Sequence, residues 1–137
     1  MPNAYQPHLA ILGRLLLAAI FLISPLVNLI PNFGATAMAM GNAGIPFPTL
    51  ALAIAIAMLL AGSVSMIAGY RARWGALLLL LFLLPATYYF HAPWKANDAA
   101  EVAAQAVHFL KNIGLMGAML MIIVLGSGPG SFEGRGR

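Results

Sequence analysis

The side chains of this chain that could do chemistry are few, and one of them is a histidine within a run of aromatic residues. His91 lies in the segment YYFHAPWK. A neutral imidazole has one nitrogen that donates and one that accepts a hydrogen bond, so His91 could hold a lipid-soluble ligand such as a quinone through its carbonyl. It could equally be an interfacial histidine in an aromatic belt, which requires no ligand. The sequence leaves both interpretations open.

A polar stripe is the second candidate for chemistry. Glu101, Gln105, His108 and Asn112 are spaced by four, three and four residues, which places them on one face of a helix. Such a stripe is either an amphipathic stretch in the membrane interface or a proton-linked site inside a bundle, where ionisable groups are costly and often functional. Lys111 favours the first interpretation, because a lysine side chain can extend to the interface.

Three further polar residues lie in the first apolar stretch. We expect the Arg14 side chain to extend to the cytoplasmic headgroups; binding of an anionic lipid or an acidic partner is the alternative. Ser24 and Asn28 flank Pro25, which lacks an amide donor and frees a backbone carbonyl. Their side chains therefore satisfy either that backbone or a ligand.

Several classes of function are excluded or disfavoured. The chain has no cysteine, which excludes disulfides and thiolate-held iron–sulfur clusters. It contains no phosphate-binding loop, no GxSxG elbow and no HExxH motif. Its net charge of +4 is not clustered as nucleic-acid binding requires. We predict no catalytic residue, no metal site and no cofactor bound by this chain alone, with quinone or lipid as the ligand class that remains.

The elements that position these groups are predicted to be membrane-spanning helices. Of 137 residues, 62% are hydrophobic and only 7% are charged, whereas soluble domains have about 25% charged residues. A spanning helix needs roughly 20 apolar residues, and runs such as LLLLLFLL lack the alternation of barrel strands. We predict an all-α bundle of four transmembrane helices within a single domain, residues 1–126, at about 9–30, 47–69, 74–90 and 107–126.

The charged residues indicate the topology of these helices. Cytoplasmic segments carry an excess of lysine and arginine. Five arginines would lie on one side of the membrane and Lys95 and Lys111 on the other, which predicts that both termini are cytoplasmic. The five are Arg14, Arg71, Arg73, Arg135 and Arg137. We expect Arg14, Arg71, Arg73 and Trp74 at the lipid interface and a flexible glycine-rich tail at 127–137.

Small residues recur every four positions in the second predicted helix. Because lipid provides no hydrophobic drive for helix association, close approach of backbones matters there. We predict that this stripe is the main helix-packing seam, formed by Ala53, Ala57, Ala61, Ser65 and Gly69.

The order of several motifs resembles that of the DoxX family of four-helix membrane proteins. The first helix carries LGRLLLAAIFLISPLVNLI and is followed by NFGATAMAMGNAGIPFP. The later matches are YRARWGALLLLLF, ATYYFHAPW, FLKNIGLMGAMLMI and the GPG of the tail. The resemblance covers most of the chain and implies a bundle in the bacterial cytoplasmic (inner) membrane.

The resemblance also bears on function. Some DoxX relatives are membrane subunits of thiosulfate–quinone oxidoreductases, and others associate with redox partners. By position, His91 and Trp94 match the family's histidine and tryptophan, and Lys111 and Asn112 match its Leu–Lys–Asn. Together these indicate candidate ligand-binding residues at His91, Trp94, His108 and Asn112.

This chain also departs from the family pattern. The family often has a lysine where Asn28 stands and a glutamate near Leu59. A site that depends on such a pair is absent here, which favours a structural subunit of a larger membrane complex, without catalysis and with other membrane proteins and the lipid bilayer as partners. The alternative is a quinone- or lipophile-binding subunit of an oxidoreductase complex.

Overall fold

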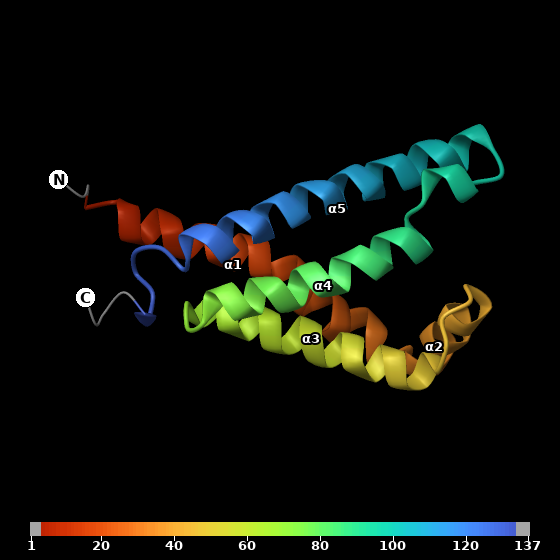
Figure 1. Ribbon diagram of the computed structural model, residues 1–137, viewed down its shortest axis with the longest axis horizontal. Coiled ribbons are helices and arrows are strands. Elements are labelled where there is room, and N and C mark those ends of the chain that lie inside the picture. The colour runs from red at the N-terminus through yellow and green to blue at the C-terminus, as the bar shows by residue number, and fades with distance from the viewer. Residues whose placement is uncertain (1–3, 134–137) are drawn as a thin grey trace.

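The computed structural model describes residues 4–133, and these form a bundle of long helices that lie side by side (Figure 1). Each of four helical segments in this range is long and apolar enough to cross a membrane, and no strand occurs in it. The predicted all-α bundle of four spans is therefore confirmed. The long helices are α1 (Gln6–Ser24), α3 (Pro48–Ala68), α4 (Ala72–Phe90) and α5 (Ala99–Leu125).

Three short elements join or extend these helices. A π-helical turn, η1 (Pro25–Leu29), continues α1, and the 3-10 turn η2 (Pro93–Lys95) follows α4. The Ile30 amide donates to the Pro25 carbonyl at 2.9 Å, five residues back, so the disturbance expected at Pro25 takes the form of a π turn. Helix α2 (Phe33–Asn42) lies between the first two predicted spans, where the hydropathy pattern predicts no helix.

The last helix begins at Ala99, earlier than the predicted residue 107. Asp98 caps it, because its side chain accepts a hydrogen bond from the Glu101 amide at 2.8 Å. The Glu101 carboxylate in turn accepts from the Asn97 amide at 2.9 Å. This reciprocal pair resembles a capping box, and the alanine-rich sequence that follows has high helix propensity. Hydropathy alone could not place the start, since the first turns are polar.

Two glycines bring α3 and α4 together near the turn that joins them. A Cβ added at Gly62 would lie 3.0 Å from the Gly75 carbonyl oxygen, and one added at Gly75 would lie 3.0 Å from the Gly62 carbonyl oxygen. The two backbones are thus in direct contact, as close packing in membranes favours. Around this crossing lies the main core, which includes Leu59, Met66, Leu79, Leu83 and Met119.

The predicted packing seam is wrong for its three alanines. Ala53, Ala57 and Ala61 are exposed, whereas the buried face of α3 carries Leu52, Leu59, Gly62, Ser63 and Met66. The four-residue stripe of small side chains is therefore on the other side of the helix. Of the remaining two, Ser65 contacts α4 beside Gly75, and Gly69 is buried at the end of α3 in a left-handed conformation. Size alone does not show which face of a helix meets its neighbour.

The prediction of a flexible tail is wrong for residues 127–133, which fold back beneath the bundle. Carbonyls of Ser127, Pro129 and Gly130 accept hydrogen bonds from the Arg14 guanidinium. Arg14 is only 6% exposed, so its side chain does not extend to the headgroups as expected. A buried charge requires polar partners, and the tail supplies them. Residues 134–137 lie outside the described part of the chain.

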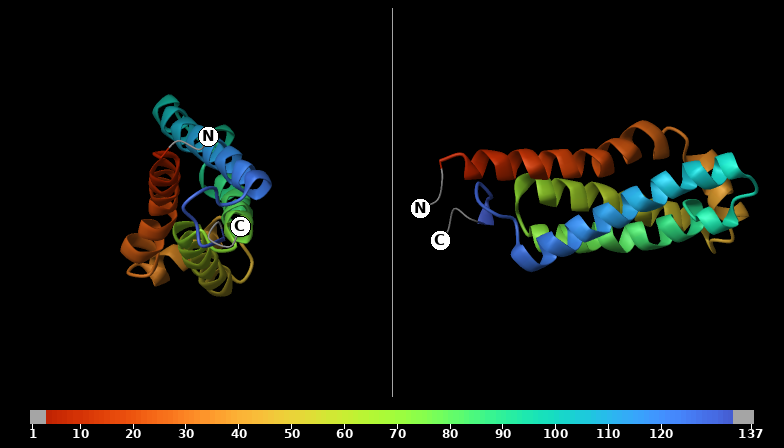
Figure 2. Two further views of the ribbon diagram at one scale, coloured as in Figure 1. Left: turned by 90° about the vertical axis from the view of Figure 1, so that its left-hand side faces the viewer. Right: turned by 90° about the horizontal axis from the view of Figure 1, so that it is seen from above.

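A second set of contacts holds the tail against the α3–α4 turn. The Phe132 and Glu133 amides donate to the Ala68 and Gly69 carbonyls, and the Arg71 amide donates to the Glu133 carboxylate at 2.8 Å. Figure 2 shows that this turn lies at the same end of the bundle as the start of α1 and the end of α5. We call it the tail end, and the opposite end, which carries α2, the α2 end.

We expect Gly75→Ala to destabilise the bundle by about 1–3 kcal/mol, because the new Cβ would lie 2.7 Å from the Ser65 Cβ and 3.0 Å from the Gly62 carbonyl. Unfolding in mixed detergent micelles measures the change. Gly114→Ala is the matched control, since a Cβ there meets nothing within 4 Å. A Gly75→Ala protein as stable as the control would contradict the proposed contact.

Candidate functional site

An apolar cleft of about 610 Å³ lies among the described residues. Five elements contribute to its walls: α1, η1, α2, α3 and α4. It lies at the α2 end, where the far ends of α4 and α5 diverge from α2 (Figure 1). Its apolar wall consists of aliphatic, aromatic and methionine side chains, among them Leu29, Met40, Leu52, Met58, Phe82 and Phe90.

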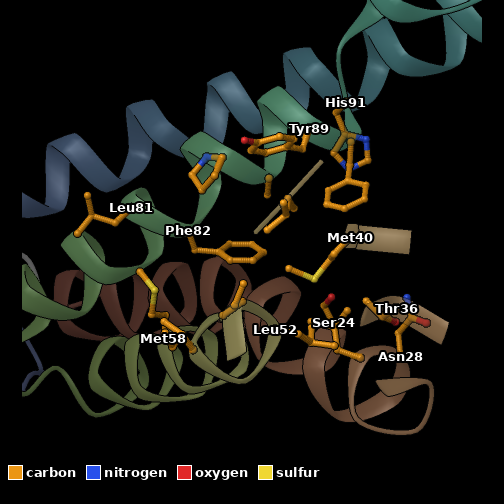
Figure 3. Close-up of a pocket in the computed structure, with 18 residues that line it drawn as sticks. Ser24, Asn28, Thr36, Met40, Leu52, Met58, Leu81, Phe82, Tyr89 and His91 are labelled. Carbon is orange, nitrogen blue, oxygen red and sulfur yellow. The ribbon is translucent and has the colours of Figure 1, made fainter. Parts of the chain in front are cut away.

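Polar side chains face the cleft from two sides. Ser24, Asn28 and Thr36 lie together on one wall, and His91 lies on the facing wall, with Met40 between them (Figure 3). The first wall comes from α1, η1 and α2, and the second from the end of α4. An apolar chamber with a few convergent polar groups is the usual form of a small-molecule site.

The π turn positions the polar groups of the first wall. Asn32 donates through its side-chain amide to the Asn28 carbonyl at 3.0 Å and to the Asn28 Oδ1 at 3.4 Å. The Asn28 side-chain amide nitrogen is left for a ligand. No hydrogen bond from the Ser24 hydroxyl to the proline-freed backbone is present among residues 4–133. π turns occur frequently at functional sites.

His91 is held on the second wall by α5. Its Nδ1 lies 3.1 Å from the Gln105 Oε1, and its ring stacks on that of His108 with centroids 4.9 Å apart and an interplanar angle of 29°. Gln105 and His108 thus contact the back of the histidine, while His91 itself lines the cleft. Two residues of the predicted polar stripe, Gln105 and His108, contact His91, and a third, Glu101, caps the start of α5.

Asn112 serves the packing of α4 against α5. Its side-chain amide donates to the Thr87 hydroxyl at 2.9 Å, and both residues are buried. Thr87 lies one turn before His91, and its carbonyl also accepts from the His91 amide at 3.1 Å. This pair therefore fixes the end of α4 from which His91 projects.

The other predicted residues lie away from the cleft. Trp94 is 62% exposed and packs edge-on against Phe109, with ring centroids 5.6 Å apart. Of the four candidate ligand-binding residues, His91 alone lines the cleft. At the tail end, Arg71 and Arg73 are exposed and Trp74 is 67% exposed, as a lipid-facing interface requires.

The polar groups of the cleft can form hydrogen bonds with a bound molecule. Within the described part of the chain, no group of three or more histidine, aspartate or glutamate side chains could hold a metal ion. The cleft presents hydroxyl, amide and imidazole groups beside an apolar wall. Such a set can hold a lipophilic molecule by its polar end.

Thr36 is one of the cleft residues that the sequence analysis missed. It sits on α2, which hydropathy did not predict. The signal that could have found it is the resemblance of NFGAT to the motif that follows the family's first helix, because that resemblance already covered this segment.

Comparison with known proteins supports the resemblance seen in the motifs. The family model described as DoxX matches residues 9–92, a range that contains every residue lining the cleft. The protein named Inner membrane protein YphA, from Escherichia coli strain K12, is 28% identical over 133 residues, which cover 97% of this chain and 94% of that protein. No solved structure shows a significant match.

We expect Asn112→Leu to cost about 1–2 kcal/mol of stability, because it leaves the buried Thr87 hydroxyl without its partner. The double variant Asn112→Leu/Thr87→Val should recover most of that loss, since both ends of the hydrogen bond are then apolar. Unfolding of the single and double variants in mixed micelles measures the coupling. Strictly additive losses would show that the two side chains do not interact.

Proposed function

Because this chain belongs to the DoxX family and is an integral protein of the bacterial inner membrane, we propose that it is a membrane subunit that holds a lipophilic, ring-bearing molecule. The single observation that carries the proposal is the cleft of about 610 Å³. Its lining is mostly apolar, and its polar side chains are those of Ser24, Asn28, Thr36 and His91, with the Tyr89 hydroxyl. Quinones are one class with this combination of a polar ring and an apolar chain.

The dimensions and lining of the cleft support a ligand of this kind. Small-molecule sites commonly enclose about 300–1,000 Å³. Phe82, Tyr89 and Phe90 supply aromatic faces, and Met40 and Met58 supply adaptable thioethers. Aromatic and methionine side chains are favourable neighbours for a planar ring.

The position of the cleft supports entry from the bilayer rather than from water. Ile54 and Leu81 line the cleft and are also 50% and 48% exposed on the apolar surface that lipid covers. A molecule dissolved in the membrane can therefore reach the cleft sideways. Any electron transfer to or from the ligand belongs to a partner, because His91 and its neighbours offer no metal-binding set.

A structural role in a larger complex remains the second candidate, and α5 favours it. This helix packs mainly against α4, and Gly114 and Gly117 on it meet nothing within 4 Å. Close approach of a partner helix is easiest at such positions. The two roles are compatible, since a ligand-holding subunit also needs a partner that uses the ligand.

Filling the cleft tests the proposal. Ala86 lines the cleft, whereas Leu84 on the same helix does not and is 51% exposed. We expect protein purified in mild detergent to retain a quinone or similar lipophile detectable by mass spectrometry of its lipid extract. Ala86→Trp should lose it, and Leu84→Trp should keep it. A purely structural subunit would show no ligand that depends on Ala86, with all three proteins recovered in the same large complex.

We also propose that the tail end faces the cytoplasm, because it carries Arg71 and Arg73. The absence of native cysteine makes single-cysteine labelling a clean test. In spheroplasts, a membrane-impermeant maleimide should label Asn97→Cys and should label Tyr70→Cys only after lysis. Labelling of Tyr70→Cys in intact spheroplasts would reverse the orientation.

A further inference from the structure

The hydrogen bond between His91 and Gln105 determines which kind of polar atom the cleft offers. A glutamine Oε1 can only accept, so its contact of 3.1 Å with the His91 Nδ1 is a hydrogen bond in the tautomer that carries the hydrogen on Nδ1. In a neutral imidazole the other nitrogen, Nε2, is then an acceptor. A doubly protonated, charged ring would be costly beside a wall as apolar as that of the cleft.

The Nε2 atom has no hydrogen-bond partner within residues 4–133, whereas the His91 backbone amide and Nδ1 both have one. A ligand that reaches Nε2 from the cleft would therefore meet an acceptor. A hydroxyl can satisfy that atom by donating to it. A quinone carbonyl cannot, because it would set two lone pairs against each other.

The facing wall has the opposite polarity. Asn28 already accepts through Oδ1 from Asn32, which leaves its side-chain amide as a donor. The hydroxyls of Ser24 and Thr36 beside it can either donate or accept a hydrogen bond. A ligand that spans the cleft therefore needs a donor on the His91 side and an acceptor on the Asn28 side. A ring hydroxyl can donate, and its oxygen or a neighbouring methoxy or hydroxyl oxygen can accept.

We infer that the cleft selects a hydroxyl-bearing ring, a hydroquinone or a phenol with an apolar chain, over the oxidised quinone. The inference rests on the proposed function and adds the hydrogen-bond polarity of the ligand to it. Gln105 is a positioning residue here: it touches no ligand and acts by holding the tautomer of His91. No chemical step is required, only a difference in affinity between two redox forms of one ring.

Three probes separate the chemistry: decylubiquinone, its hydroquinone kept reduced under argon, and the dimethyl ether of that hydroquinone. Native mass spectrometry of the full chain in mild detergent measures the apparent Kd of each, with Ala86→Trp as the blocked-cleft blank. We expect the hydroquinone to bind about tenfold more tightly than the quinone or the ether, as one unmatched hydrogen bond predicts. The ether has the reduced ring but no hydroxyl donor, so it separates the effect of ring reduction from that of hydrogen-bond donation.

Matched variants test the role of Gln105. Gln105→Glu keeps an acceptor at Nδ1 and should keep the preference. Gln105→Met has a similar shape but no acceptor, frees the tautomer and should reduce the preference below about threefold while leaving the thermal unfolding midpoint close to that of the parent. His91→Phe keeps a ring and should lose the preference entirely.

The outcomes distinguish this inference from the proposed function. Quinone binding as tight as or tighter than hydroquinone binding, and abolished by Ala86→Trp, would overturn the inference and leave the function intact. A preference unchanged in Gln105→Met would overturn the tautomer argument. If none of the three probes binds above the blocked-cleft blank, both the inference and the proposed function fail.

Discussion

Hydrocarbon offers no hydrogen bonds, and this constraint governs the whole structure. Each polar group at membrane depth must find its partner within the protein. The Arg14 guanidinium meets the carbonyls of the tail, Asn112 meets Thr87, and the Ser63 hydroxyl donates to the Leu59 carbonyl at 2.6 Å. Among the buried side-chain atoms of residues 4–133, the Arg14 Nε alone lacks a partner. The polar groups of the cleft differ from these, because Ser24 and Asn28 are exposed at its wall rather than buried.

The same helices explain why the cleft lies where it does. At the tail end, Gly62 and Gly75 let the backbones of α3 and α4 touch. At the α2 end, α4 diverges from α3 (Figure 1), and helix α2 packs on α3 through Ala37, Met40 and Leu52. The π turn at Pro25 rotates the end of the first span, and Asn28 faces the space that results. Helices α3 and α4 thus pack closely at the tail end and diverge at the α2 end. Residues 127–133 pack against the closely packed end.

The departures from the family pattern acquire a structural meaning. Leu59, where the family often has a glutamate, is 1% exposed and packed in the core between α3 and its neighbours. A carboxylate there would need a buried partner, and Asn28 instead of a lysine supplies no charge. This chain therefore places its polar contacts at the cleft, where an uncharged ligand suits uncharged side chains. Within the described residues, that choice agrees with a cleft that lacks acidic and basic side chains apart from the imidazole of His91.

Composition and hydropathy by themselves showed that lipid surrounds the helices, how many helices span it, and that the fold is all-α. A spanning helix needs only about 20 consecutive apolar residues, which local sequence supplies. Motif order likewise determined the family. Only the tertiary structure decided which face of α3 packs, that the tail meets Arg14, and that His91 shares a cleft with Ser24, Asn28 and Thr36. A repeat of small residues such as Ala53 and Ala57 fits a lipid-facing surface as well as a packed one. Facing walls of a cleft come from distant segments, and their meeting depends on helix crossing and on one π turn, which no local pattern encodes.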